Sequence, residues 1–494
     1  MPADTNPMLQ KQVIYSVFVR NHTKEGTFLS VIPDLDRIRD LGVDVVWLMP
    51  IHPTGEKGRK GTLGSPYANR DYRAVNPEYG TLDDFRQLVD AIHARGMRCI
   101  IDVVYNHTSP DSALFEQHPE FFYRKPDGNP GNHVGDWSDV IDLDYGTPGR
   151  WNKPLWDYQI ESLCYWATMV DGFRCDVASF VPVEFWKAAR EAVAKVRPDA
   201  IWLAETVHRS FGKACRALGM CCARDTETFE AFDIEYSYDV QETFDNYLRG
   251  KATLSHYLDL VDFQDCAYPA YYNKLRYLEN HDLPRIAGRD SDPRDLRNLT
   301  AMAYFLKGTT LLYAGQEVAA EHQPSLFDRD TVDWTVRCDL SGLMRTLYGI
   351  KRDVLEPTDY CHATADDEKD VAVMYRDDVR KEAGDMPRTV GVFSLRGKAA
   401  RVAVDVADGT YRNLIDASDV VVEGGELACD GEPVIMRCPR SFRCSCRRRP
   451  RASARGTKPR DMRRARRSVH GEARDTERGR RPSVVPLCVR TPVP

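Results

Sequence analysis

Short apolar runs rich in β-branched and aromatic residues alternate with amphipathic segments from residue 13 to about residue 315. The runs are mostly apolar, as strands that are covered on both faces should be. We expect eight strands, at residues 13–18, 43–48, 97–103, 171–176, 200–205, 229–233, 274–279 and 309–314. Eight parallel strands joined by covering helices predict an α/β fold, a closed (β/α)8 barrel of the TIM type.

The segments between the runs carry helix signals. Apolar residues at helical spacing predict a helix over residues 31–41. Thr81 and Asp84 have the spacing of a capping box at the start of another helix. A third helix is predicted for residues 182–196, because Pro182 is favoured in the first turn of a helix.

Length and composition indicate a globular protein of several domains. At roughly 150 residues per domain, 494 residues suggest about three domains, and 42% hydrophobic with 29% charged residues excludes a largely disordered chain. The longest apolar runs fall short of the ~20 residues of a membrane span, and the first twelve residues do not resemble a secretion signal. The 14 cysteines are scattered without zinc-site spacing, which favours buried reduced thiols. We therefore expect a cytoplasmic protein without a membrane partner.

The net charge of −6 conceals two different kinds of chain. Residues 437–494 hold 18 arginines and one lysine against four acidic residues, a net charge of +15, which leaves −21 for residues 1–436. The tail has no apolar periodicity, and we expect it to be disordered. Its basic clusters would attract nucleic acid, but the acidic body argues against nucleic acid as a partner. We favour an extension without a selected role, such as out-of-frame translation, over a basic interaction arm.

Carboxylates follow predicted strands at their carboxyl ends, where the chemistry of this fold is located. The segments DVVYNH, GFRCDV, LAET and LENHD begin at residues 102, 172, 203 and 278. They bring Asp176, Glu205 and Asp282 to one end of the barrel, with Arg174 two residues before the first. Any one of them alone is more often a helix cap or a solvated ion pair. Crowding three carboxylates is costly, so the set together indicates a functional site.

Two neighbouring carboxylates suit glycoside chemistry. Asp176 and Glu205 end adjacent strands, and a pair about 5–5.5 Å apart supports retaining hydrolysis, with one carboxylate as nucleophile and the other as acid and then base. Arg174 can keep Asp176 ionised, while Glu205 must hold a proton near neutral pH. Asp282 can stabilise the oxocarbenium-like charge or bind sugar hydroxyls.

Together the four segments resemble the signature regions of the α-amylase family of glycoside hydrolases, in order and with suitable separations. The resemblance runs from about residue 12 to residue 436. It includes GSPYANRDYRAVNPEYGT at residues 64–81 and YAGQE at residues 313–317. It implies that Asp176 is the nucleophile, Glu205 the acid/base and Asp282 the transition-state stabiliser. The substrate-binding residues that it implies are Tyr67, which stacks on the reacting sugar, Asp102, His107, Arg174 and His281.

The resemblance also implies domain limits. The barrel takes residues 1–107 and 151–356, and residues 108–150 form a short domain B inserted after the third strand. From about residue 357 the chain changes to short alternating runs separated by turns, which predict a C-terminal antiparallel β-sandwich over residues 357–436. Residues 437–494 remain outside these domains.

Departures from the family pattern bear on calcium. Secreted amylases carry Lys-His shortly after the nucleophile, where this chain has Ala178, Ser179 and Phe180. Asn106 matches a family calcium ligand, but a short domain B leaves few other oxygens. We expect no required cofactor, and we expect calcium to matter less here than in secreted amylases.

The sequence therefore predicts a retaining hydrolase of α-glucosidic bonds in maltooligosaccharides, α-glucans or short α-glucosides. The alternative is an α-glucan transglycosylase or a trehalose-synthase-type isomerase of the same family. A second alternative is a non-catalytic amylase-like protein, which would be expected to lack the carboxylates and to carry a membrane span. The substrate would be an oligosaccharide or an α-glucan, and the sequence predicts no oligomeric state.

Overall fold

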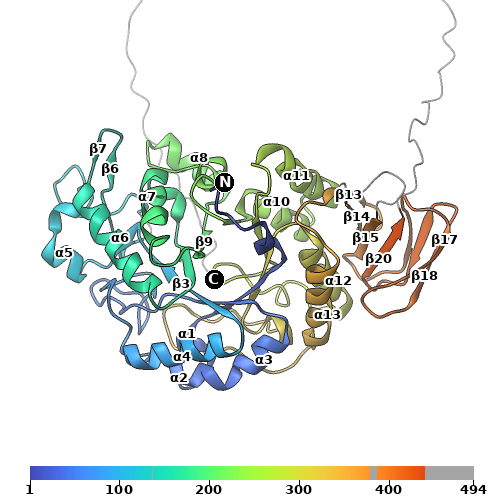
Figure 1. Cartoon of the computed structure of the whole chain (residues 1–494), viewed down its shortest axis with the longest axis horizontal. Helices are drawn as coiled ribbons and strands as arrows, with labels where there is room; N and C mark the ends of the chain where they lie inside the picture. The colour runs from blue at the N-terminus through green and yellow to red at the C-terminus, as the bar shows by residue number, and fades with distance from the viewer. Residues whose placement is uncertain (136, 379–386, 440–494) are drawn as a thin grey trace, which may run out of the picture. The chain divides into compact units, whose positions relative to one another are not determined.

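A computed structural model describes residues 1–135, 137–378 and 387–439, and Figure 1 shows its elements. Eight parallel strands close into a barrel in the order β1-β12-β11-β10-β9-β8-β3-β2. These strands are β1 (Val13–Val17), β2 (Val45–Leu48), β3 (Arg98–Val103), β8 (Gly172–Cys175), β9 (Ile201–Ala204), β10 (Ile234–Tyr236), β11 (Lys274–Arg276) and β12 (Thr309–Tyr313). The predicted (β/α)8 barrel is confirmed.

The sixth strand lies later than predicted. Residues 229–233, the predicted position, follow the short helix α9 (Asp225–Thr228) and form no strand, whereas β10 covers Ile234–Tyr236. Phe229 and Phe232 gave the apolar signal, but both are buried by packing against aromatic rings of neighbouring elements. The strand itself carries a charged residue, Glu235, whose partner comes from another strand.

The barrel helices follow the local signals. They include α4 (Leu82–Ala94), α6 (Lys153–Ala167), α7 (Val183–Val193), α8 (Arg209–Ala217), α10 (Tyr238–Leu248), α11 (Leu254–Ala267), α12 (Pro293–Phe305) and α13 (Ser341–Asp353). Thr81 and Asp84 form the predicted capping box of α4. The helix predicted over residues 31–41 is instead divided into α2 (Phe28–Val31), a 3-10 turn and α3 (Leu35–Asp40). Pro33 lies in that turn, where its missing N–H interrupts regular helix.

Two smaller parts accompany the barrel. Between β3 and α6 the chain forms two small antiparallel strand pairs, β4 (His107–Thr108) with β5 (Ile141–Asp142) and β6 (Gly146–Thr147) with β7 (Arg150–Trp151). The C-terminal part holds one antiparallel sheet of β13 (Tyr360–Asp366), β14 (Val371–Asp377), β15 (Pro387–Ser394) and β20 (Val434–Pro439). A second holds β16 (Ala400–Ala403), β19 (Glu426–Cys429), β18 (Asp419–Glu423) and β17 (Gly409–Arg412). A mostly valine core joins the two sheets, which confirms the predicted sandwich.

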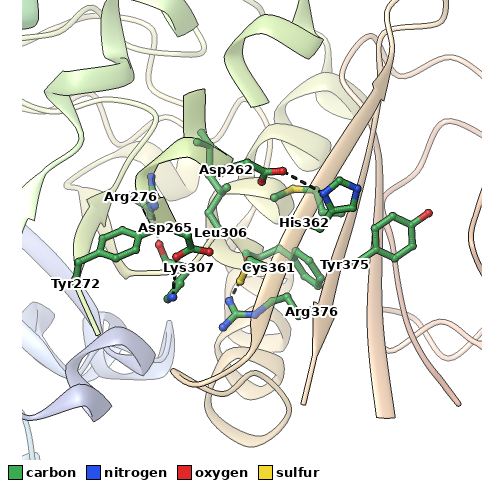
Figure 2. Close-up of a pocket in the computed structure, with 13 residues that line it drawn as sticks. Asp262, Asp265, Tyr272, Arg276, Leu306, Lys307, Cys361, His362, Tyr375 and Arg376 are labelled. Atoms are coloured by element: carbon green, nitrogen blue, oxygen red, sulfur yellow. Dashed lines mark hydrogen bonds and ion pairs between the residues drawn. The ribbon is translucent and has the colours of Figure 1, made fainter. Parts of the chain in front are cut away.

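The sandwich packs on the barrel through β13 and α11. Figure 2 shows the small cavity of about 20 Å³ at this contact, where His362 Nδ1 lies 3.3 Å from Asp262 Oδ2. Arg376 is buried beside it and donates to the carbonyl oxygens of Phe305 and Glu356 at 3.0 and 2.8 Å. The cavity holds roughly one water molecule, so it offers no room for a sugar.

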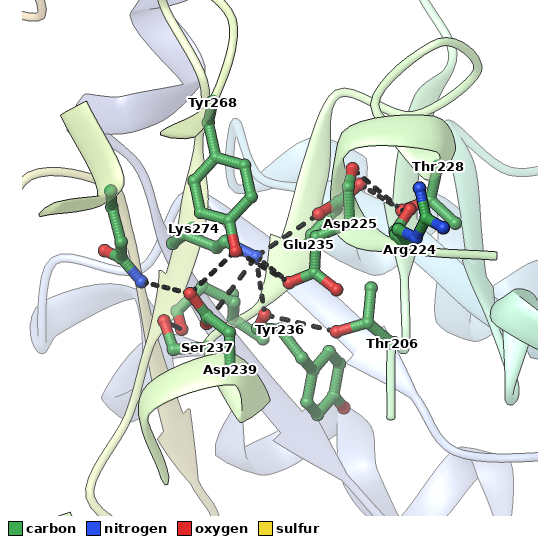
Figure 3. Close-up of polar contacts among 12 residues, drawn as sticks. Thr206, Arg224, Asp225, Thr228, Glu235, Tyr236, Ser237, Asp239, Tyr268 and Lys274 are labelled. Carbon is green, nitrogen blue, oxygen red and sulfur yellow. Dashed lines mark hydrogen bonds and ion pairs between the residues drawn. The ribbon is translucent and has the colours of Figure 1, made fainter. Parts of the chain in front are cut away.

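A buried lysine links the sixth and seventh barrel strands (Figure 3). Lys274 Nζ lies 3.3 Å from Glu235 Oε2 and 3.6 Å from Asp239 Oδ1, and it is also paired with Asp225. The ammonium group donates to the carbonyl oxygen of Tyr236 at 3.3 Å. Glu235 and Lys274 are neighbours in the β10–β11 register, so one cation serves three carboxylates at the place where the two strands pair.

We expect Lys274→Met to lower the free energy of unfolding by about 3–5 kcal/mol, because it leaves buried carboxylates without their cation. The matched control is Lys307→Met. The Lys307 ammonium group pairs with Asp265 in a partly exposed position, so its loss should cost under about 1 kcal/mol. Urea denaturation measures both. A loss at Lys274 no larger than that at Lys307 would contradict this role.

The last strand extends past the predicted domain limit. β20 runs to Pro439, three residues beyond residue 436, and Cys438 is buried opposite Arg388 in the ladder. The arginine-rich tail predicted for residues 437–494 lies outside the described residues from residue 440 onward. The eleven cysteines within the described ranges are free thiols, and six of them are buried. Among those residues no helix is both long and apolar enough to cross a membrane.

We expect a chain that ends at Ser441 to match the full chain in Tm and in kcat/KM, because unpaired arginine side chains are costly to bury. A chain that ends at Met436 should melt lower, since it lacks the last three residues of β20. Calorimetry and rate measurements on the two truncated chains provide the check. If the longer one unfolds or loses activity, the tail is structural.

Candidate active site

One guanidinium group joins the carboxylates at the carboxyl ends of three neighbouring strands. Arg174 Nη1, on β8, donates to both carboxylate oxygens of Asp102 on β3 at 2.9 and 3.0 Å, and to Asp176 Oδ1 at 2.8 Å. Its Nη2 lies 2.9 Å from Glu205 Oε2, an ion pair without hydrogen-bond geometry. All four side chains are buried. The structure thus brings together four of the residues that the sequence singled out.

Arg174 contacts one oxygen of Asp176 and one oxygen of Glu205, which leaves the second oxygen of each carboxylate for chemistry. Asp176 Oδ1 accepts from Arg174, whereas Oδ2 lies 3.9 Å from His107 Nε2. Glu205 Oε2 accepts the backbone N–H of Val177 at 2.8 Å in addition to its contact with Arg174. A proton on Glu205 is therefore best placed on Oε1, because Oε2 already faces two donors.

Val177 holds an unusual backbone conformation at this point. Its φ of 34° lies in the left-handed region, which is strained for a β-branched residue. The Val177 N–H, in the peptide bond that joins Val177 to Asp176, donates to Glu205 Oε2. Sequence patterns carry no signal for this conformation, because valine does not predict a left-handed residue.

Burial sets the protonation of the carboxyl groups. It raises the pKa of Asp176 to about 7 although Arg174 opposes the shift. Burial likewise raises the pKa of Asp102 to about 7 and that of Glu205 well above its usual value. Burial therefore favours the protonated form of each of these carboxyl groups, and the Arg174 guanidinium opposes this shift in all three pKa values.

A second group of predicted residues faces this cluster. The Tyr67 hydroxyl donates to Asp102 Oδ2 at 3.2 Å and lies 2.7 Å from His281 Nε2, and the two rings are stacked with centroids 5.3 Å apart. His281 Nε2 lies 3.2 Å from Asp282 Oδ2. Burial lowers the pKa of His281 to about 4, so its ring is neutral. The Asp282 side chain is 41% exposed and is the most accessible carboxylate of the set.

Sequence reasoning missed several residues of the site. Trp47 and Tyr236 lie on β2 and β10, and their ring centroids are 5.1 and 5.5 Å from the Arg174 guanidinium carbon. Asn280 Oδ1 accepts the backbone N–H of Asp282 at 2.8 Å. Each lies at or just past the end of a barrel strand, which is the one signal that could have indicated it.

Calcium finds few ligands here. Asn106, the candidate ligand, is buried, and its amide nitrogen lies 3.1 Å from His107 Nδ1. Within the described residues no three His, Cys, Asp or Glu side chains are grouped to hold a metal ion. Calcium prefers six or more oxygen ligands, so Asn106 alone does not make a site, and its role as a calcium ligand stays a prediction.

We expect chelation with EDTA to change Tm by less than about 2 °C and to leave kcat/KM unchanged, because no three His, Cys, Asp or Glu side chains of the described residues are grouped to hold a metal ion. Calorimetry and rates with and without added calcium are the measurement. A large loss of both quantities that calcium restores would contradict the expectation. A magnesium addition in parallel separates specific binding from an ionic-strength effect.

The chain was compared with known families and proteins. Residues 12–138 and 151–389 match the model of "Alpha amylase, catalytic domain", and residues 362–436 match "Bacterial Alpha amylase C-terminal domain". An alpha-amylase from Lactobacillus plantarum is 43% identical in sequence, with a TM-score of 0.82 over 87% of this chain and 100% of that one. The maltogenic alpha-amylase AmyB from Thermotoga neapolitana is 31% identical, with a TM-score of 0.75 over 87% and 99% of the two chains.

Curated relatives include transferases as well as amylases. The alpha-1,4-glucan:maltose-1-phosphate maltosyltransferase of Myxococcus xanthus is 27% identical over 326 residues, which cover 62% of this chain. This chain spans only 46% of the length of that protein. The family model covers well over half of the chain, and the amylase structures align along nearly its whole described length. The chain belongs to the α-amylase family of glycoside hydrolases.

Proposed function

We propose that this protein is a retaining hydrolase of α-glucosidic bonds in maltooligosaccharides, α-glucans or short α-glucosides. The single guanidinium that contacts both Asp176 and Glu205 carries the proposal, because it keeps the two carboxylates close together, and retaining hydrolysis uses a closely spaced pair. Their different hydrogen-bond partners, Arg174 for Asp176 Oδ1 and the Val177 N–H for Glu205 Oε2, support distinct roles for them. The free thiols of the described residues support a reducing, cytoplasmic location.

In the first step Asp176 Oδ2 attacks the anomeric carbon. The bond from that carbon to the glycosidic oxygen breaks, and the oxygen takes the proton of Glu205 Oε1, so that an alcohol departs. The sugar is then bound to Asp176 as an ester of inverted configuration. Glu205, now a carboxylate, removes a proton from water, whose oxygen displaces Asp176 and restores the α-configuration.

The neighbouring residues stabilise this path. Arg174 keeps its hydrogen bond to Asp176 Oδ1, which favours the carboxylate before attack and after release. Asp282, the exposed carboxylate, is placed to stabilise the positive charge of the transition state. His281, His107 and Tyr67 supply neutral polar groups for the hydroxyls and ring of the reacting sugar.

The second candidate is glycosyl transfer, in which a sugar hydroxyl replaces water in the second step. The maltosyltransferase relatives favour it, although this chain spans less than half of the Myxococcus protein. The chemistry at Asp176 and Glu205 is the same for both reactions. They differ only in which acceptor reaches the glycosyl-enzyme.

Proton NMR of maltotetraose cleavage tests the proposal. The newly released reducing end should appear first as the α-anomer and convert slowly to the mixture. Release of the β-anomer would contradict retention. A product profile on maltose, isomaltose, sucrose, trehalose and soluble starch identifies the substrate class, and products longer than the substrate would identify transfer.

A further inference from the structure

The loop that follows Glu205 carries a histidine with no role in the chemistry above. His208 lies three residues after Glu205, at the start of α8, and is partly exposed. Its ring packs on that of Tyr238, the first residue of α10, with centroids 4.0 Å apart and planes inclined by 32°. The histidine therefore occupies the rim of the barrel beside the proposed acid/base.

Tyr238 connects this histidine to the far side of the site. Asn280 Nδ2 donates to the Tyr238 hydroxyl at 3.1 Å, while Asn280 Oδ1 accepts the backbone N–H groups of Asp282 and Leu283 at 2.8 and 3.0 Å. Tyr238 thus joins His208, through the contact between their rings, to the Asn280 side chain that holds the backbone at Asp282.

Residues that pack around Tyr238 carry polar atoms whose hydrogen-bonding capacity is unused. Among the described residues, His208 Nδ1 and the hydroxyls of Tyr236 and Tyr277 are buried without a hydrogen-bond partner. The rings of Tyr236 and Tyr277 lie 5.1 and 6.0 Å from that of Tyr238, so all three residues pack around Tyr238. Buried polar atoms without partners are rare in folded proteins and call for a ligand or a bound water.

The protonation state of His208 suits a neutral ligand. Burial lowers the pKa of its ring below the usual value. A neutral imidazole has one donor and one acceptor nitrogen, and here no protein partner fixes the tautomer. The ring can therefore donate a hydrogen bond to a sugar hydroxyl or accept one from it. Its stacking on Tyr238 holds it in place.

The order of the strands indicates on which side of the cleaved bond His208 lies. β9 lies between β8, which leads to Asp176, and β10, which leads to Tyr238. Glu205 protonates the departing oxygen, so the departing sugar lies beside Glu205 and away from Asp176. We propose that His208, supported by Tyr238, binds the sugar on the leaving-group side and favours a sugar over water as acceptor. This proposal rests on the proposed function of Asp176 and Glu205.

Two substrates separate binding from a structural role. Maltotetraose places sugars on the leaving-group side, whereas α-maltosyl fluoride has only a fluoride ion there. We expect His208→Ala to lower the ratio of kcat/KM for maltotetraose to that for the fluoride by about tenfold or more. His208→Gln, which retains a donor and an acceptor, should recover most of the ratio. The control is His256→Ala, an exposed histidine of α11, which should leave the ratio unchanged.

Transfer provides a second measurement. With α-maltosyl fluoride as donor and added glucose as acceptor, His208→Ala should lower the ratio of transfer to hydrolysis by about fivefold or more. Equal losses on maltotetraose and the fluoride would overturn the proposal, because they would show that His208 acts only through Tyr238 and Asp282. Unchanged ratios would overturn it as well. Inactivity of the unmodified protein on both substrates would instead refute the proposed function.

Discussion

Asp176→Asn should lower kcat on maltotetraose by about 10⁴-fold or more, because an amide oxygen cannot form the glycosyl ester. The change is nearly isosteric, and the new side chain can still accept the hydrogen bond from Arg174 Nη1. Steady-state rates measure the loss, and near-native circular dichroism shows that the fold is intact. Asp157→Asn, an exposed position on α6, is the matched control and should retain full activity.

The same variant should change the pH dependence of stability. Burial raises the pKa of Asp176 in the folded protein to about 7, above the value of about 4 for an unfolded chain. A carboxyl group shifted upward stabilises the fold while it is protonated, and this contribution is lost as pH rises through the folded pKa. Asp176→Asn cannot lose it, so its Tm relative to the unmodified protein should increase between pH 5 and pH 8. A substantially active variant, or a Tm difference that falls over this range, would contradict the assignment.

Local signals predicted most of the fold. The capping box of Thr81 and Asp84 and the valine-rich strands depend on neighbours in the chain, and the structure contains them. The sixth strand was misplaced because Glu235 is satisfied by Lys274, about forty residues further along the chain. When only the apolar positions are considered, a charged residue whose partner lies on another strand is interpreted as part of a turn or as a surface residue.

The candidate site shows the same limit. The two-residue spacing of Arg174 and Asp176 directs both side chains to one face of β8, and the structure places them 2.8 Å apart. No sequence pattern indicates the left-handed conformation of Val177 or the contact of its N–H with Glu205. Composition likewise does not reveal that the rings of Trp47 and Tyr236 flank Arg174. The sequence therefore predicts which groups react, but it does not predict the geometry in which the structure holds them.

Glu205→Gln should lower kcat/KM on maltotetraose by about 10²–10⁴-fold, because the departing sugar oxygen no longer receives the proton from Oε1. Fluoride needs no proton to depart, so α-maltosyl fluoride should still form the glycosyl-enzyme at a rate within about tenfold of the unmodified protein. The second step then lacks its base and becomes slow. Azide, which attacks without a base, should accelerate turnover and yield α-maltosyl azide.

These substrates distinguish acid/base catalysis from a positioning effect. If Glu205 only held Val177 and Arg174 in place, its loss would disturb Asp176 and slow both substrates equally, since both require the nucleophile. A selective loss on maltotetraose, with rescue by azide on the fluoride, requires a group that exchanges a proton with the leaving and entering oxygens. Glu230→Gln, an exposed carboxylate paired with Lys187, should behave as the unmodified protein in all three assays. Equal losses on the two substrates, or a β-azide product, would remove Glu205 from the acid/base role.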